Sequence, residues 1–393
     1  MSMPVREAPK PTIPLLEQGF RPFFLGAALF AGLAVPAWIA SFGAGAEWPT
    51  HLAPVTWHAH EMIFGYFGAV IGGFILTAIP NWTTRLPVRG GPLAALVGLW
   101  LAGRVAMATS ASWPITAASL DMVYLIVLSL VAWRELIASR NIKNLPICAL
   151  IALVAIANIG FHVAALNDGD TTIFVRIALG IAAVLIGLIG GRIVPSFTHN
   201  WLVKQGETTL PVPFGSFDKV AVGVLAATVI AWMAQPDAAA TGAALAVAAL
   251  LHAVRVTRWR FWATAREPLL LILHIGSYWL AVWLALQALS VLAPEILDGS
   301  TALHALTTGA VGTMTLAVMT RAIRGHTGHA LTADGATVGC YALVILGALL
   351  RIAVPFVPFD RVWMLATSGS LWASAFVVFV ISYGKMVMGP RRP

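Results

Sequence analysis

The sequence predicts an all-α polytopic membrane protein with about twelve transmembrane helices. Of its 393 residues, 59% are hydrophobic and only 10% are charged, and the mean hydropathy is +0.85. A soluble domain carries roughly a quarter charged residues. Apolar runs of about 17–25 residues recur along the chain, each long enough to cross a hydrocarbon core of roughly 30 Å. A transmembrane β-barrel would instead show short segments of alternating polarity.

The twelve predicted spans follow one another with short connections. In chain order they cover residues 22–42, 56–80, 92–109, 115–138, 145–166, 172–195, 217–235, 238–254, 268–292, 301–320, 335–354 and 361–386. No connection is long enough for a soluble domain, so we expect one membrane domain, 22–386. It lies between an N-terminal tail, 1–21, and a C-terminal tail, 387–393. The N-terminal tail is polar and proline-rich and lacks the apolar core of a signal peptide.

Basic residues predict the orientation of the chain. All but four of the 24 Lys and Arg residues fall in the tails or in alternate connections between spans, the exceptions being Arg104, Arg176, Arg351 and Arg361. Cytoplasmic segments of membrane proteins carry such an excess, so we expect both termini in the cytoplasm. Anionic lipid of the bilayer accounts for the net charge of +8, and nucleic acid is not required.

Ionisable side chains gather near the outer ends of several predicted spans. At about 1.5 Å of rise per residue, they form one layer roughly 4–9 Å deep. Such groups are costly in hydrocarbon and usually face a bundle interior or a water-filled cavity. The layer comprises His58, His60 and Glu61 of the second span, Arg104 of the third, Asp121 of the fourth, His162 of the fifth, Arg176 of the sixth and His304 of the tenth.

Some of these residues have simpler explanations. Arg104 and Asp121 lie at matching depth on adjacent antiparallel spans, so they are expected to form an ion pair with each other. His162, near the end of its span, is expected to bond water or lipid headgroups. A second layer on the cytoplasmic side contains His274 in the ninth span, Arg192 in the sixth, and Arg321 and His326 after the tenth.

The motif WHAHEMIFGY, residues 57–66, sets two histidines two positions apart. On an α-helix such side chains point about 200° away from each other. Either the helix has not begun there, or His58 and His60 serve different centres. His58 also leads a stripe on one helix face that admits a neighbouring helix or a flat cofactor, namely Glu61, Gly65, Gly68 and Gly72.

Short echoes occur at intervals of four spans. GGFILTAIPNW (72–82) in the second span is echoed by GGRIVPSFTHNW (190–201) in the sixth, and His60, Gly65 and Gly68 recur in spacing as His304, Gly309 and Gly312 in the tenth. The echoes predict three four-helix units around a pseudo-threefold axis. Haem-copper oxidases have such a twelve-span plan and hold haem with histidines near the outer ends of spans 2 and 10, which is an architectural analogy only.

Imidazole is a suitable ligand for both haem iron and copper. A bis-histidine haem needs two rings that face each other across a gap between helices, and His304 with His58 or His60 could provide them. Arg104 or Arg176 could pair with the haem propionates through charge-assisted hydrogen bonds. The second histidine of the motif would be free for another metal. Because the chain contains no CxxCH motif, a haem would be bound non-covalently.

Five ordered motifs together resemble the NnrS family over most of the chain: HAHEMIFGY, GGFILTAIPNWT, GRIVPSFTHNW, LHIGSYW and LTTGAVGTMTLAVMTRAIRGHTGH. Members are bacterial inner (plasma) membrane proteins reported to contain haem and copper, and they are associated with nitric oxide metabolism and resistance to nitrosative stress. The resemblance implies haem, expected to be of the b type, and copper in this protein. The candidate metal ligands at its motif positions are His58, His60, His274 and His304.

The leading functional hypothesis is a haem- and copper-containing membrane protein that binds or reduces nitric oxide. Reduction would make it a nitric oxide reductase-type oxidoreductase. Glu61 and Asp121 would be candidates for proton entry, and quinol or another external electron donor would be required. One alternative is a non-enzymatic haem protein that protects the cell against nitric oxide. Another is a secondary transporter of a small molecule, because twelve spans and internal repeats are also typical of transporters.

Overall fold

A computed structural model describes residues 13–392, and this part of the chain is helical without strands. Twelve segments are long and apolar enough to cross a membrane, which confirms the predicted all-α polytopic class. In chain order, spans 1 to 12 are α1 (Phe20–Ala44); α2, η2 and α3 together (Pro54–Thr83); α4 (Gly91–Ala108); α5 (Pro114–Ala138); η4 and α6 together (Ile142–Leu166); α7, η5 and α8 together (Thr172–Lys204); α9 (Ser216–Ala234); α10 (Ala239–Thr257); α11 (Pro268–Leu292); α12, η7 and α13 together (Gly299–His326); α14 and η8 together (Gly335–Phe356); and α15 (Arg361–Met388). Most of the expected N-terminal tail, 1–21, lies outside the described residues.

Several spans run further than the sequence predicted, and two of them continue past a proline. Span 2 continues beyond Pro80 to Thr83, and span 6 continues beyond Pro195 to Lys204. The prediction ended both spans at these prolines, because proline removes a backbone donor and usually breaks a helix. In a membrane bundle, neighbouring helices and local adjustments satisfy the freed backbone groups, so helices tolerate proline better there.

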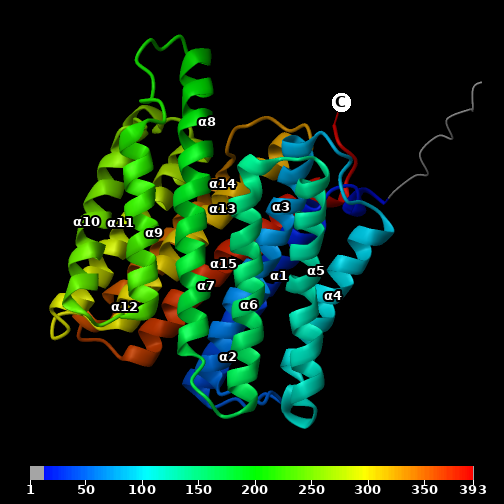
Figure 1. The fold of residues 1–393 in the computed structure, drawn as a ribbon, viewed down its shortest axis with the longest axis vertical. Helices are drawn as coiled ribbons and strands as arrows, with labels where there is room; N and C mark the ends of the chain where they lie inside the picture. The colour runs from blue at the N-terminus through cyan, green and yellow to red at the C-terminus, as the bar shows by residue number, and fades with distance from the viewer. Residues whose placement is uncertain (1–12, 393) are drawn as a thin grey trace, which may run out of the picture.

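Contacts between consecutive spans form a closed ring. Each span packs against the next, and α15 closes the ring by packing against α1. Both ends of the described chain lie at one face of the bundle, called here the termini face, at the top of Figure 1. Helices α2 and α12 lie at the opposite face, called here the far face.

Spans 2, 6 and 10 meet inside this ring. Of an 18-residue apolar stretch taken from each span, 83% is buried in span 2 and 72% in span 10, against 33% in span 7. Spans 2 and 10 therefore have little contact with lipid. Span 6 packs against both of them, and the hydroxyl groups of Tyr66 and Thr315 join spans 2 and 10 at 2.6 Å.

Each of these three central spans contains a π-helical segment: η2 (Glu61–Phe67), η5 (Ile186–Gly190) and η7 (Ala305–Val311). Segments of this kind are rare and are frequent at functional sites. Side chains of neighbouring spans donate hydrogen bonds to carbonyls within them, Trp100 to Gly65 at 2.9 Å, Arg255 to Gly187 at 2.8 Å and Trp372 to Thr308 at 3.2 Å. Their recurrence at every fourth span agrees with the proposed three-unit plan, which stays a prediction.

The outside of the ring is apolar. Large hydrophobic side chains are exposed along the spans, as a surface in contact with hydrocarbon requires. Examples from five different spans are Leu33, Leu130, Ile230, Leu250 and Ile381.

Candidate functional site

The two histidines of the WHAHEM motif lie in a formed helix and face different surroundings. Helix α2 (Pro54–His60) begins at a proline, a residue suited to the first helical position, so His58 and His60 are both helical. His58 lines a cavity, whereas His60 is fully buried among polar side chains. Because the helix begins before the motif, the alternative of an unformed helix is wrong. The other alternative, in which His58 and His60 serve different centres, agrees with the structure.

The far-face cavity, defined here as the space lined by His58, His304 and Arg351, has a volume of about 80 Å³. The remaining wall is mainly apolar and aromatic and comes from spans 1, 2, 6, 10 and 12. Three basic side chains from three different spans thus converge on one cavity.

His304 is oriented by its own helix. Its Nδ1 lies 2.7 Å from the carbonyl oxygen of Ser300. Because a carbonyl can only accept, Nδ1 carries the proton and Nε2 keeps its lone pair, which is the usual arrangement of a metal-binding histidine.

His58 is held differently. Its ring stacks on Trp38 with centroids 4.4 Å apart, and its Nδ1 is buried without a hydrogen-bond partner among the described residues. Buried polar atoms are normally hydrogen-bonded. This ring nitrogen, beside the far-face cavity, is therefore free to bind a partner other than the described residues.

Arg351 is the arginine of this cavity. Its side chain is only 9% exposed, and within the described chain it makes one long contact, 3.4 Å from Nη2 to the Ser300 hydroxyl, and no ion pair. The sequence had suggested Arg104 or Arg176 as the arginine that pairs with the haem propionates. Arg104 lies in the cluster described next, and Arg176 lies against the Trp232 ring, 6.0 Å from its centroid, so neither lines the cavity.

A second group of polar residues, the buried polar cluster, lies on the other side of span 2. It consists of His60 and Glu61 of span 2, Arg104 of span 3, Asp121 of span 4, and Asn158 and His162 of span 5, each at most 8% exposed. The expected ion pair between Arg104 and Asp121 is confirmed, and Arg104 also donates to Glu61. The expectation that His162 lies at the membrane surface is wrong. It is fully buried because its ring points into the bundle toward Asp121.

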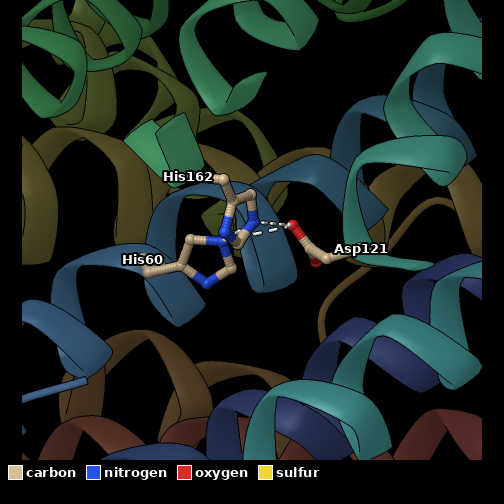
Figure 2. Close-up of side chains that lie close together, drawn as sticks. All are labelled: His60, Asp121 and His162. Atoms are coloured by element: carbon tan, nitrogen blue, oxygen red, sulfur yellow. Dashed lines mark hydrogen bonds and ion pairs between the residues drawn. The ribbon is translucent and has the colours of Figure 1, made fainter. Parts of the chain in front are cut away.

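Three ligand atoms converge inside this cluster (Figure 2). The Nε2 atoms of His60 and His162 lie 3.2 Å apart, and they lie 3.2 Å and 2.8 Å from Oδ2 of Asp121. A triangle of this size leaves room for an ion about 2 Å from each corner, which is the usual metal–ligand distance.

Hydrogen bonds around the triangle orient two of its members. Nδ1 of His60 lies 3.0 Å from Oε1 of Glu61, and Asn158 donates to Oδ2 of Asp121 at 2.8 Å. The bond to Glu61 places a proton on Nδ1 of His60, so Nε2 of its neutral ring presents a lone pair to the carboxylate of Asp121. Two acceptors facing each other at 3.2 Å repel unless a cation lies between them.

The formal charges lead to the same requirement. Two carboxylates and one guanidinium leave the cluster with a single negative charge while both histidines are neutral. Uncompensated charge in a protein interior is costly. The cluster therefore needs one further positive charge, carried by a bound metal ion or by a proton on a histidine.

The glycine stripe of span 2 is filled by side chains of the chain itself. A Cβ atom at Gly65 would lie within 3.0 Å of Arg104, Glu61 and Phe30 atoms, and one at Gly72 would lie 2.2 Å from the Tyr124 hydroxyl. Of the two alternatives, close helix packing is what the structure shows, and this face of span 2 leaves no room for a flat cofactor.

His274 lies apart from both groups. It is fully buried in α11, and its Nε2 lies 2.9 Å from the Thr198 hydroxyl. It lines neither the far-face cavity nor the triangle, so the structure does not bring it together with the other candidate ligands.

Sequence reasoning gave no functional role to Arg351, Asn158 or His162. Arg351 had been used only to orient the chain, although it lies within a predicted span, and Asn158 interrupts the apolar run LVAIANIGF. A polar residue within a span was the available signal.

Comparison with protein-family models relates the chain to a known family. The family model described as NnrS protein matches residues 14–391, nearly the whole chain. No curated protein matches it. The coverage of the family model, together with the twelve spans, shows that this chain belongs to the NnrS family and is a multi-pass membrane protein associated with the response to nitric oxide.

Proposed function

We propose that the protein binds nitric oxide at a haem held in the far-face cavity, and that a copper ion occupies the buried polar cluster. The observation that carries this proposal is the pair His58 and His304, which come from spans 2 and 10 and line the same cavity. The family supports metal and haem binding in general. The ligands named below are our assignment.

The residues that line the far-face cavity have the chemistry that a b-type haem needs. His304 and His58 would hold it through their ring nitrogens, and Arg351 would pair with one of its carboxylates. When bound, the haem would supply an iron atom that coordinates nitric oxide. His304 is fixed by Ser300, whereas His58 has no orienting hydrogen bond among the described residues. His304 would therefore contribute more to haem retention than His58.

The triangle in the buried polar cluster fits a small metal ion. Imidazole nitrogen is a good ligand for copper, and a monovalent copper ion would neutralise the single negative charge of the cluster. Glu61 would then hold the His60 ring in the tautomer that leaves Nε2 free, as carboxylates commonly do for metal-bound histidines. Arg104 and Asn158 would hold Asp121 in place.

This arrangement favours a positioning role for the two carboxylates. Glu61 and Asp121 were first considered as groups that deliver protons for the reduction of nitric oxide. Both are fully occupied by Arg104 and the histidines, and both are at most 2% exposed. We therefore assign them to the metal site. Reduction of nitric oxide remains an outcome to be measured, and it would need an external donor such as quinol.

The orientation of the protein is part of the same proposal. The excess of basic residues at the termini face supports a cytoplasmic location for that face, with the protein in the bacterial inner membrane. The far-face cavity would then lie on the periplasmic side, within reach of nitric oxide that partitions into the bilayer.

Absorption spectra of purified variants test the haem site. The wild-type protein, made in haem-replete cells, should show a Soret band that shifts on reduction and again on addition of nitric oxide. His304→Ala should lose most of the haem, and His58→Ala should retain part of it with an altered spectrum. His51→Ala is the matched control, because His51 lies near the same face but bonds to Ser110 and does not line the cavity. Full haem retention in the His58→Ala/His304→Ala double variant would exclude the assignment.

Metal analysis tests the copper site separately. His162→Ala should lose bound copper and keep haem, because His162 contacts only the buried polar cluster. Consumption of nitric oxide by the wild-type protein, followed with an electrode in the presence of a quinol, distinguishes turnover from binding alone. A colourless wild-type protein without iron or copper would support the transporter alternative.

A further inference from the structure

A larger cavity lies near the termini face. This termini-face cavity has a volume of about 490 Å³ and is lined by spans 1, 2, 5, 6, 9 and 10, together with Leu331. It is separate from the far-face cavity and from the buried polar cluster, and shares no residue with either. Neither proposed metal site accounts for it.

The polar part of the termini-face cavity is positively charged. Arg192, Arg321 and His326 line it, and no aspartate or glutamate of the described chain does. Like charges are costly to gather at the edge of a hydrocarbon region unless an anion or water compensates them. The wall thus has a built-in preference for a negatively charged group.

Arg321 has no neutralising partner among the described residues. Within residues 13–392 it forms neither a hydrogen bond nor an ion pair, and its guanidinium lies 4.3 Å from the centroid of the Phe197 ring. Arg192 donates to the neutral amide oxygen of Asn144 at 3.1 Å. Glu267, the acidic residue whose charge influences Arg321, instead caps α11 by accepting from the Leu269 amide. Both guanidinium groups therefore keep their charge available to the cavity.

Apart from Thr77 and Asn81, the remainder of the wall is apolar and aromatic. Phe24, Phe74, Ile189, Leu273 and Val318 line it. Phe74, Ile189 and Val318 also line a smaller, almost entirely apolar cavity of about 80 Å³ between the central spans. The surroundings of the two arginines on the bundle side therefore suit an apolar chain.

We propose that the termini-face cavity binds an amphiphilic anion, a molecule with a phosphate or carboxylate head and an apolar tail. Arg192 and Arg321 bind the head, since guanidinium groups match the geometry of both anions and form paired charge-assisted hydrogen bonds with them. The tail lies between Phe74 and Val318. The source is either an anionic lipid of the adjacent leaflet or an amphiphile that diffuses freely.

A photoreactive dodecyl phosphate tests this site on the full-length protein in a maltoside detergent. Labelling should be saturable and should be competed by unlabelled dodecyl phosphate. Inorganic phosphate should compete far less, because it lacks the tail. Peptide mass spectrometry should locate the label on the segments that carry Phe74, Trp82 or Phe197. This readout does not depend on haem or copper, so its outcome is independent of whether the proposed function is correct.

Charge-removing variants provide the decisive comparison. Arg192→Gln/Arg321→Gln should weaken binding by about tenfold or more, because two charge-assisted contacts are lost. Lys143→Gln/Lys204→Gln is the matched control, since it removes two exposed charges at the termini face that do not line the cavity. Arg192→Gln alone serves if the double variant fails to fold, and should weaken binding severalfold.

Two outcomes would overturn the proposal. One is labelling of equal strength in the arginine variants and the lysine control. The other is label confined to the outer surface of the bundle. Reconstitution then identifies the source. If nanodiscs containing phosphatidylglycerol suppress labelling and pure phosphatidylcholine nanodiscs do not, the ligand is a leaflet lipid. If both permit labelling, the cavity serves a diffusing amphiphile.

Discussion

Replacing Arg104 by glutamine should strongly destabilise the metal-free protein. Arg104 is 8% exposed and is the guanidinium that joins Glu61 and Asp121. Without it, the formal charge of the buried polar cluster changes from one negative charge to two negative charges. Breaking a buried pair by removing one partner typically costs about 3–5 kcal/mol. We expect a loss of that size in the free energy of unfolding, because no other cation of the cluster replaces the guanidinium.

A double-mutant cycle with Asp121→Asn measures the coupling directly. Unfolding would be followed in mixed micelles with increasing dodecyl sulfate, after removal of metal with a chelator. The second substitution restores the single negative charge, so it should cost much less in the Arg104→Gln background than in the wild type. Coupling energies between close charge pairs are about 1.5 kcal/mol or more.

Arg134→Gln provides the control for this cycle. The Arg134 side chain is 67% exposed and pairs with Glu135 at 2.6 Å, and an exposed pair of this kind contributes at most about 1 kcal/mol. Additive effects of Arg104→Gln and Asp121→Asn, to within about 0.5 kcal/mol, would refute the claim that the two residues form one electrostatic unit.

Two further changes test the packing that positions the sites. Gly191→Ala would place a Cβ 2.1 Å from Nη2 of Arg255 and should cost about 1–3 kcal/mol through overpacking. Gly223→Ala, where no atom lies within 4 Å, should be neutral or slightly stabilising in the same unfolding assay. Asp334→Asn weakens the ion pair with Arg324 at the N-terminus of α14 and should lower stability by about 1 kcal/mol. An unchanged unfolding midpoint would contradict either expected loss.

The depth of the polar groups was predictable from the sequence, whereas their partners were not. The layer containing His58, His60 and His304 followed from span boundaries and the rise of a helix. The spacing of His58 and His60 left two alternatives, a helix that has not yet begun or two different centres, and the structure agrees with the second. That His60 meets His162, and that Arg351 faces the cavity of His58, depended on how each span is rotated about its axis. The moderate polarity differences around these largely apolar helices do not specify that rotation.

The sequence by itself determined the class of the protein and the number of its spans. Hydrocarbon permits only structures that satisfy their own backbone, so the length and polarity of each segment decide whether it crosses the bilayer. Only the tertiary structure decided which residues form each site. The glycines at positions 65 and 72, equally compatible with a cofactor in the sequence, are covered by Arg104 and Tyr124. Side chains from other spans determine the environment of these glycines. Such contacts join residues far apart in the chain, so a local sequence pattern does not predict them.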